Sequence, residues 1–128
     1  MVQLRPAWAQ AVTAPSVVQA ILGGDVLALQ RLTHPDVVNR SARPDEPTGW
    51  AGLRELALTA CATVPDATVE LVGSHGDTAV CLVHASVGRP GWGDAVVHSA
   101  LVVLRFRDGL VSEIWSSSDL TGADFVAA

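Results

Sequence analysis

Residues 95–117 read AVVHSALVVLRFRDGLVSEIWSS, and this stretch decides the fold class. Its two segments, 95–106 and 110–117, are rich in Val and Leu, as β-strands usually are. The pair Asp108-Gly109 stands between them and tolerates the positive φ angles of a type I′ turn. The stretch therefore predicts an antiparallel β-hairpin.

Three more strands are expected before this hairpin. Residues 67–72 and 78–87 have the same Val-rich composition, and glycine-containing segments at 73–76 and 88–93 separate them from each other and from the hairpin. A shorter strand is expected at 37–40. Most of the chain after residue 66 is thus predicted to form a sheet.

The earlier part of the chain shows helical periodicity. A Ser-x-x-Gln capping box at 16–19 predicts a first helix over about 14–22. Asp25 is expected to cap a second, short helix, and a His-Pro-Asp turn is expected at 34–36. Apolar residues three and four positions apart predict a third helix over 48–64.

Helices followed by strands are typical of an α+β domain. We therefore expect a single domain over residues 1–128, with about three helices on the concave face of a conical, curved antiparallel sheet. This arrangement leaves a pocket between helices and sheet, which is suited to a small hydrophobic molecule.

Composition excludes several classes of function. The 128 residues carry a formal net charge of −5, and the basic residues are all Arg, which argues against nucleic acid or an anionic membrane as partner. Cys61 and Cys81 have no Cys/His cluster around them, so neither a disulfide scaffold nor a metal site is expected. The uncharged run 6–24 is interrupted by polar residues, Pro and Gly, so we expect no signal peptide, no membrane span and a cytoplasmic protein. No glycine-rich nucleotide fingerprint is present, and no cofactor is expected.

Asp119 stands apart from the other acidic residues, most of which lie in turn, cap or solvent-facing contexts. Strict alternation along the last strand places Val111, Trp115 and Asp119 on one face. A carboxyl group beside an indole in an apolar pocket has a raised pKa, because desolvation disfavours its charged form, and it can exchange protons near neutral pH. Asp119 is also placed to cap a turn over 120–125, so both roles remain open.

Two histidines lie inside predicted strands. His98 shares a face with Ala100 and Val102, and His84 shares one with Leu82. Each histidine could be a pocket residue or a hydrogen-bonded core residue. The core role is slightly favoured for His84, and both roles are open for His98.

Segment 23–39 opens with Gly-Gly-Asp and closes with Val-Val-Asn, and segment 105–119 is an Arg-Phe-Arg-Asp-Gly hairpin followed by Glu-Ile-Trp-Ser-Ser-Ser-Asp. Together with a helix that begins at Trp50 and ends in Val-Pro-Asp, these motifs resemble the SnoaL-like polyketide cyclases of the nuclear transport factor 2-like superfamily. The resemblance covers roughly residues 14–126.

The resemblance implies a conical domain, commonly a homodimer, with a cofactor-free pocket. In the cyclases the Asp of the last motif is the acid/base of an aldol-type ring closure, a role that would fall on Asp119. An Asn of the first strand helps to hold substrate or water, and Asn39 occupies a similar place. This chain has Gly-Arg-Pro-Gly at 88–91 where the family often carries a His, so His98 would have to substitute. Further candidates for substrate binding are aromatic or imidazole side chains: Trp50, Trp115 and His84.

These inferences favour a small enzyme, a polyketide cyclase or isomerase, in which Asp119 moves the proton and His98 or Asn39 polarises a carbonyl. Two alternatives stay open: an epoxide hydrolase or cyclase of the same fold, and a non-catalytic module for ligand binding or dimerisation. Strand 95–106 is apolar on both faces and helices can cover only one, so we expect a homodimer through the outer face of the sheet.

Overall fold

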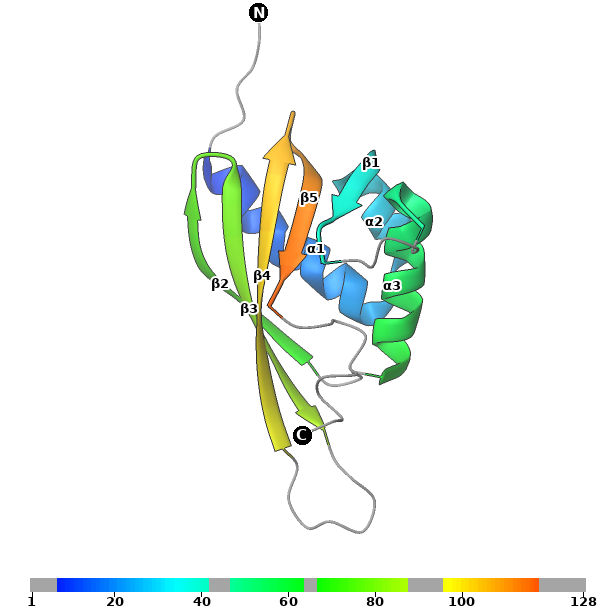
Figure 1. Cartoon of the computed structure of the whole chain (residues 1–128). Helices are drawn as coiled ribbons and strands as arrows, with labels where there is room; N and C mark the ends of the chain where they lie inside the picture. Colours follow the sequence, from blue (N-terminus) through cyan, green and yellow to red (C-terminus); the bar gives the residue numbers. More distant parts are fainter. Residues whose placement is uncertain (1–6, 42–46, 64–66, 88–95, 118–128) are drawn as a thin grey trace, which may run out of the picture.

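The computed structural model describes residues 7–41, 47–63, 67–87 and 96–117. Its five strands form one sheet in the order β1-β5-β4-β3-β2. The result confirms the predicted α+β class (Figure 1). The elements, in chain order, are α1 (Ala7–Gly23), α2 (Val26–Leu32), β1 (Thr33–Asn39), α3 (Gly49–Thr63), β2 (Ala67–His75), β3 (Thr78–Val87), β4 (Val96–Arg107) and β5 (Leu110–Ser116).

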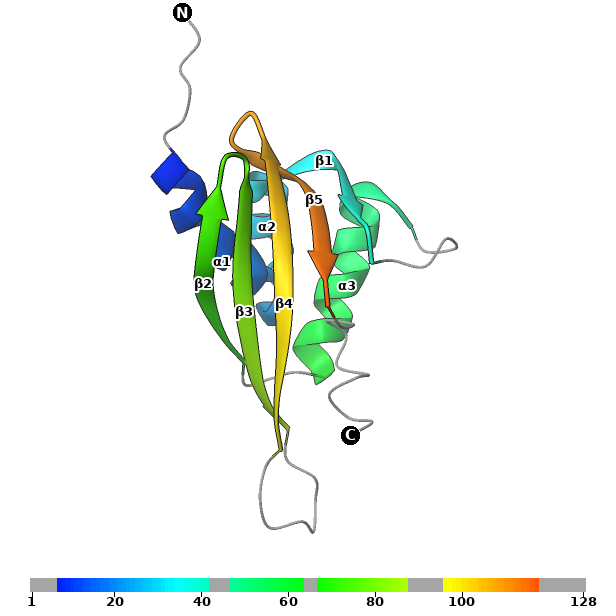
Figure 2. The same ribbon diagram turned by 60° about the vertical axis from the view of Figure 1, so that its left-hand side comes forward.

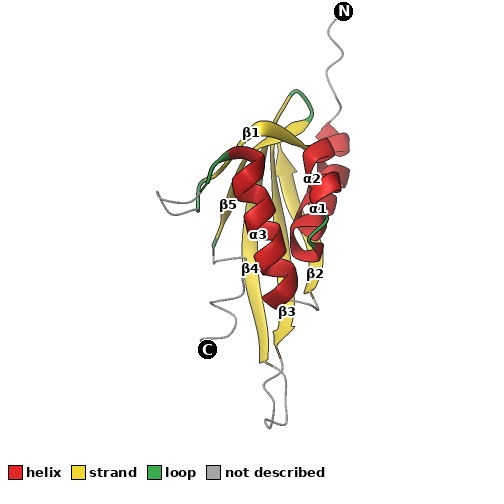
Figure 3. Cartoon of the chain, turned by 90° about the vertical axis from the view of Figure 1, so that its right-hand side faces the viewer, coloured by secondary structure: helices red, strands yellow, loops and turns green. Residues whose placement is uncertain are grey.

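All three helices lie on the same side of the curled sheet, which we call the inner face (Figures 1 and 3). The opposite side is the outer face, and the strands that form it are seen in Figure 2. Helix α1 packs against β2 and β3, whereas α3 packs against α1 and β1. The inner face of the described sheet is therefore lined by helices along most of its width.

The first strand differs from its prediction. Residues 34–36 are predicted as a turn, but they lie within β1, whose backbone pairs with β5. Pro35 is tolerated there because β1 is an edge strand, where a missing N–H leaves no ladder bond unmade. The pairing of β1 with β5 is parallel, so the sheet is mixed rather than wholly antiparallel.

Helix boundaries follow the local signals closely, with one exception. Asp25 caps α2 as predicted, because its carboxylate accepts a hydrogen bond of 3.1 Å from the backbone N–H of Ala28. Helix α1 begins at Ala7, well before the predicted start, and Pro15 lies inside it. The capping box at 16–19 is therefore internal to α1.

The Asp108-Gly109 hairpin forms as predicted. The φ angles of these two residues are 54° and 82°, the positive pair that a type I′ turn requires. Past the turn, however, the pairing slips: Arg105 pairs with Glu113, whereas Phe106 pairs with Val111, so Ser112 is an extra residue in β5.

This bulge overturns one sequence prediction. Because one residue is inserted, Val111 and Ile114 both face the helices and are fully buried. Trp115 pairs with Val103 and lies on the outer face. The predicted alternation, with Val111 and Trp115 on one face, is therefore wrong.

The hydrophobic core lies between the helices and the inner face. Along β3 and β4, both residues of every second pair point into the core, and these side chains are essentially inaccessible to solvent. The inner-face members of β3 and β4 in the core are Ala79, Cys81, Val83, Val102, Leu104 and Phe106.

Candidate functional site

Asn39 ends β1, in register with the inner-facing Ile114 of β5. Its side-chain oxygen accepts a hydrogen bond of 3.0 Å from the backbone N–H of Ser41, which closes a small turn. Asn39 is partly buried, so its amide lies at the margin of the inner face. The predicted substrate-binding role of Asn39 stays a prediction, and its side-chain oxygen is engaged within the chain.

Ser41 is a residue that the sequence analysis missed. Its hydroxyl donates to the carbonyl of Ser116 at 3.2 Å and accepts from the N–H of Ser116 at 2.9 Å. On the other side of β5, Ser117 bonds both backbone groups of Leu101, at 2.8 and 2.9 Å. These bonds fasten the end of β5 on both sides, and no pattern in the sequence marks Ser41 for this contact 75 residues away.

His98 lies in β4 and pairs with Ala85 of β3. It precedes Ala100 by two residues and Val102 by four, so its backbone position is on the same face of the strand as theirs. Ala100 and Val102 are both buried on the inner face. The backbone thus puts His98 at an inner-facing position of the strand, as the sequence pattern predicts. Its side chain is outside the described part of the structure.

The structure does not test Asp119, because the described chain ends at residue 117. Its separation along the chain from Ser116, the last residue of β5, follows from the sequence. Asp119 comes three residues after Ser116, whose backbone is held by Ser41. Three residues of fully extended chain span about 10 Å, so Asp119 lies no farther than this from Ser116.

Trp50 lies near the start of α3 and is half-buried. Its indole N–H donates to the hydroxyl of Thr33 at 3.1 Å, and the same hydroxyl donates to the carbonyl of Leu29 at 2.6 Å. Thr33 is a buried polar residue, and this chain of bonds ties α3 to α2 and β1. Trp50 therefore has a clear structural role, whatever else it contacts.

The other two candidates lie on the outer face. His84 pairs with Ser99 across β3 and β4, and its Nδ1 is 2.9 Å from the Ser99 hydroxyl. Trp115 lies beside Val103. Both side chains are partly exposed, so His84 is not a core histidine. Neither residue faces the helix-lined side of the sheet.

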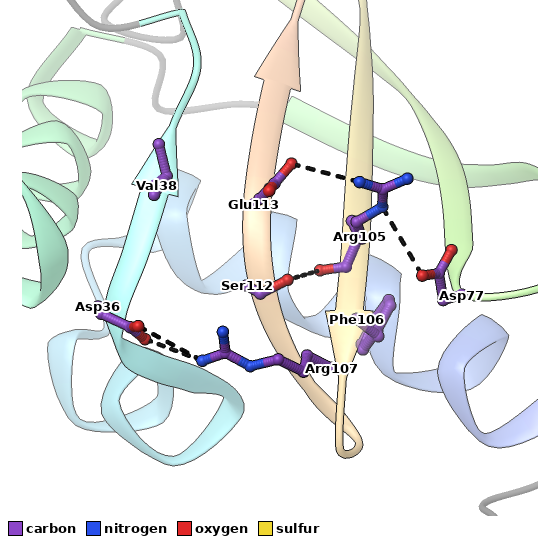
Figure 4. Close-up of a pocket in the computed structure, with 8 residues that line it drawn as sticks. All are labelled: Asp36, Val38, Asp77, Arg105, Phe106, Arg107, Ser112 and Glu113. Atoms are coloured by element: carbon purple, nitrogen blue, oxygen red, sulfur yellow. Dashed lines mark hydrogen bonds and ion pairs between the residues drawn. The ribbon is translucent and has the colours of Figure 1, made fainter.

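A pocket of about 280 Å³ opens on the outer face, where β1, β5 and β4 meet beside the hairpin turn (Figure 4). It is shallow and open, and charged groups dominate it. An apolar substrate would find few apolar partners in such a site. The lining residues are Asp36, Val38, Asp77, Arg105, Phe106, Arg107, Ser112 and Glu113.

Ion pairs occupy the charged groups of this pocket. Arg107 lies 3.2 Å from Asp36. Arg105 stands between two carboxylates, 3.7 Å from Asp77 and 3.8 Å from Glu113 (Figure 4). Because each pair is at least partly exposed to solvent, each contributes little to stability. The pocket thus shows mutually compensated charge rather than an unpaired catalytic group.

The thiols behave differently from each other. Burial raises the pKa of the Cys81 thiol from 9.0 to about 11, since the thiolate would be stripped of water. Cys61 is less buried, and its thiol donates to the carbonyl of Leu58 at 3.3 Å. A thiol with a raised pKa is a poor nucleophile, which agrees with an inert role for Cys81.

Within the described ranges, no group of three or more His, Cys, Asp or Glu side chains is arranged to hold a metal ion. None of the described helices is long and apolar enough to cross a membrane. Both observations concern only those residues.

Comparison with known proteins identifies the family. The SnoaL-like domain profile matches residues 16–114, which is most of the chain. The chain belongs to the SnoaL-like family. A search of the curated proteins found no significant match.

Solved structures of the same fold support the assignment. A proposed polyketide cyclase from Bacillus cereus is 17% identical, with a TM-score of 0.72 over 94% of this chain and 81% of that one. IdmH of Streptomyces antibioticus, also a proposed polyketide cyclase, is 23% identical, with a TM-score of 0.62 over 86% and 91%. AclR of Streptomyces galilaeus, a proposed hydroxylase, is 22% identical, with a TM-score of 0.62 over 90% and 81%. At these identities the likeness shows the fold alone.

Proposed function

We propose that this SnoaL-like protein is a cofactor-independent acid/base enzyme, a polyketide cyclase or isomerase that acts on a hydrophobic carbonyl compound. Family membership over residues 16–114 is the observation that carries the proposal. The proposed polyketide cyclases among its structural neighbours support the same substrate class. Asp119 would remove a proton next to the carbonyl and return one to the new alkoxide.

Register separates the two residues considered for polarising the carbonyl, Asn39 and His98. Asn39 of β1 pairs with Ile114 of β5, and Ile114 pairs in turn with Leu104 of β4. His98 lies six residues further along β4, a separation of roughly 20 Å along the strand. One carbonyl oxygen therefore cannot be shared by both residues, and Asn39 would contact a different part of the substrate.

The bulge in β5 changes the argument for Asp119. The supposed neighbour Trp115 lies on the outer face, so an indole no longer explains a raised pKa of the Asp119 carboxyl. Support for Asp119 now comes from the family motif and from the short chain that connects it to the fastened end of β5. Trp115 has no part in the proposed mechanism.

The test is the Asp119→Asn variant, with Asp124→Asn as a matched control near the same terminus. Removing the proton-transfer group should lower turnover of a cyclisable polyketide-type ketone by about 10² to 10⁴-fold, while the control keeps its activity. Circular dichroism should show both variants folded. If Asp119→Asn turns over the substrate within about threefold of the unsubstituted protein, the proposed acid/base role is wrong.

The same assay separates the two alternatives. An epoxide hydrolase or cyclase would also depend on Asp119 but would consume epoxide rather than ketone, because a neutral carboxyl can protonate an epoxide oxygen. A binding module would hold the ligand with the same affinity in both variants and turn over neither substrate.

We also propose that the protein is a homodimer through the outer face. Leu101 of β4 is 44% exposed, and Val72 of β2 is 57% exposed. Other apolar side chains on the outer face are partly exposed, and no helix covers them in the described part of the chain. A second copy would remove this apolar surface from water.

A further inference from the structure

Four charged side chains cross the outer face in a line, and their signs alternate. In strand order they are Arg40, directly after β1, Glu113 of β5, Arg105 of β4, and Asp77 in the turn before β3; we call them the charged row. Arg40 and Glu113 are 3.2 Å apart, and Arg105 lies 3.7 to 3.8 Å from its two neighbours. The row thus reads positive, negative, positive, negative (Figure 4 shows three of its members).

Beside the charged row lies a group of apolar residues that we call the apolar band. Its members lie on the outer-facing side of β3, β4 and β5, and register connects them: Val80 pairs with Val103, and Val103 pairs with Trp115. Leu82 pairs with Leu101 in the next outer-facing row. Sheets pack face to face through such apolar surfaces at about 10 Å.

We infer that the charged row sets how two copies of this chain meet, and that it places the two-fold axis along the strands between β4 and β5. This inference rests on the proposed homodimer. A two-fold axis in that place reverses the order of the row in the second copy. Glu113 then faces Arg105 of the other copy, Arg40 faces Asp77, and every charge meets its opposite.

Like-charge repulsion disfavours the two neighbouring positions of the two-fold axis. An axis centred on β4 would oppose Arg105 to its own copy and Glu113 to Asp77, so like charges would meet. An axis centred on β5 would oppose Glu113 to itself and Arg40 to Arg105. Because like charges that meet across an interface repel each other, the row selects one lateral register.

The apolar band is compatible with this axis. With β4 of one copy over β5 of the other, Val103 faces Trp115 twice, once on each side of the axis. An indole packed on a branched aliphatic side chain is a common anchor of interfaces. The apolar contact would supply most of the affinity, and the row would supply the orientation.

Exposure of the charged groups fits such a role. The side chains of Arg40, Arg105 and Asp77 are 50%, 51% and 57% exposed, so within one copy they are loosely engaged. Glu113 is 20% exposed and lies between two Arg side chains. Half-exposed ion pairs contribute little within the chain, which leaves these groups available to a second copy.

The test uses two charge reversals, Arg105→Glu and Glu113→Arg, first alone and then mixed. In each homodimer like charges would meet at positions 105 and 113, so dissociation measured by sedimentation equilibrium should be at least about tenfold easier. In a heterodimer of the two variants, an acidic residue faces a basic residue at both contacts between positions 105 and 113. Heterodimers should therefore form with near wild-type affinity. Native mass spectrometry of differently tagged chains would count them.

Controls keep the outcome interpretable. Arg54→Glu and Glu55→Arg reverse exposed charges on α3, and both variants should remain dimers. A second pair, Arg40→Glu with Asp77→Arg, should repeat the rescue if either variant of the first pair fails to fold by circular dichroism.

Three results would overturn the inference. A monomeric unsubstituted protein would refute the homodimer itself. A dimer that tolerates both reversals would refute only the role of the row. Reversals that dissociate the dimer without rescue on mixing would point to an axis across the strands, in which the row meets the far end of the sheet near His84 and Ser99.

Discussion

The inner and outer faces of the sheet are built from alternate residues of the same strands, yet they differ in almost every property. Along β4, Ala100 and Val102 are buried, whereas Leu101 between them and Ser99 before them are exposed. The inner face is apolar and covered by helices; the outer face mixes an apolar band with paired charges. The comparison teaches that the fold is specified from the inner face, which leaves the outer face free for a partner.

Core substitutions should show the largest difference between the faces. Leu104→Ala removes a fully buried side chain and should lower the free energy of unfolding by about 2 to 5 kcal/mol. Leu101→Ala on the outer face should cost less than about 1 kcal/mol, since its side chain is 44% exposed. Urea unfolding, with Arg105→Glu in both proteins to suppress association, measures both. Equal losses would contradict the distinction between the faces.

The buried thiol offers the next largest effect. Because the pKa of Cys81 is about 11 in the folded protein and 9.0 is its ordinary value, the unfolded chain loses this proton first as the pH rises. The free energy of unfolding should therefore fall between pH 9 and pH 11, by at most about 3 kcal/mol.

The control for this prediction is the other cysteine. Cys81→Ala should remove that part of the alkaline loss of stability, whereas Cys61→Ala should keep it. Thermal unfolding at several pH values measures the difference. A profile that is unchanged by Cys81→Ala would show that burial does not perturb this thiol.

Much of the secondary structure could be predicted from the sequence, because strong local signals mark its caps, turns and strands. Asp25 caps α2, the Asp108-Gly109 turn forms, and strand 78–87 has its predicted bounds. The family resemblance is confirmed by the match over residues 16–114.

Other features depend on contacts between distant segments, which local patterns do not reveal. The extra Ser112 in β5 sends Trp115 to the outer face, and residues 34–36 extend along β5 instead of turning. The hydrogen bonds between the Ser41 hydroxyl and the Ser116 backbone likewise join segments far apart in the sequence. The predicted roles of Asp119 and His98 remain predictions.

A smaller effect tests whether the hydrogen bond between Trp50 and Thr33 stabilises the fold. Thr33→Val removes the acceptor of the Trp50 indole N–H and should cost about 1 to 2 kcal/mol of unfolding free energy. Thr68→Val, at an exposed outer-face position, should change stability by less than about 0.5 kcal/mol. In the Trp50→Phe background the cost of Thr33→Val should shrink, because the bond is already absent. An unchanged cost would mean that this hydrogen bond does not stabilise the fold.

The most direct test of the account asks which face binds a small hydrophobic carbonyl compound. Methyl groups report the faces separately, since those of Leu56, Ala100 and Ile114 lie on the helix-covered side and those of Leu82, Leu101 and Val103 on the other. We would titrate a methyl-labelled sample with a polycyclic aromatic polyketide that carries a ketone side chain, and follow the methyl NMR signals. The account predicts saturable shifts of the inner-face methyls alone. Shifts confined to the outer-face methyls, or to those of Val38 in the outer-face pocket beside the hairpin turn, would contradict binding at the inner face.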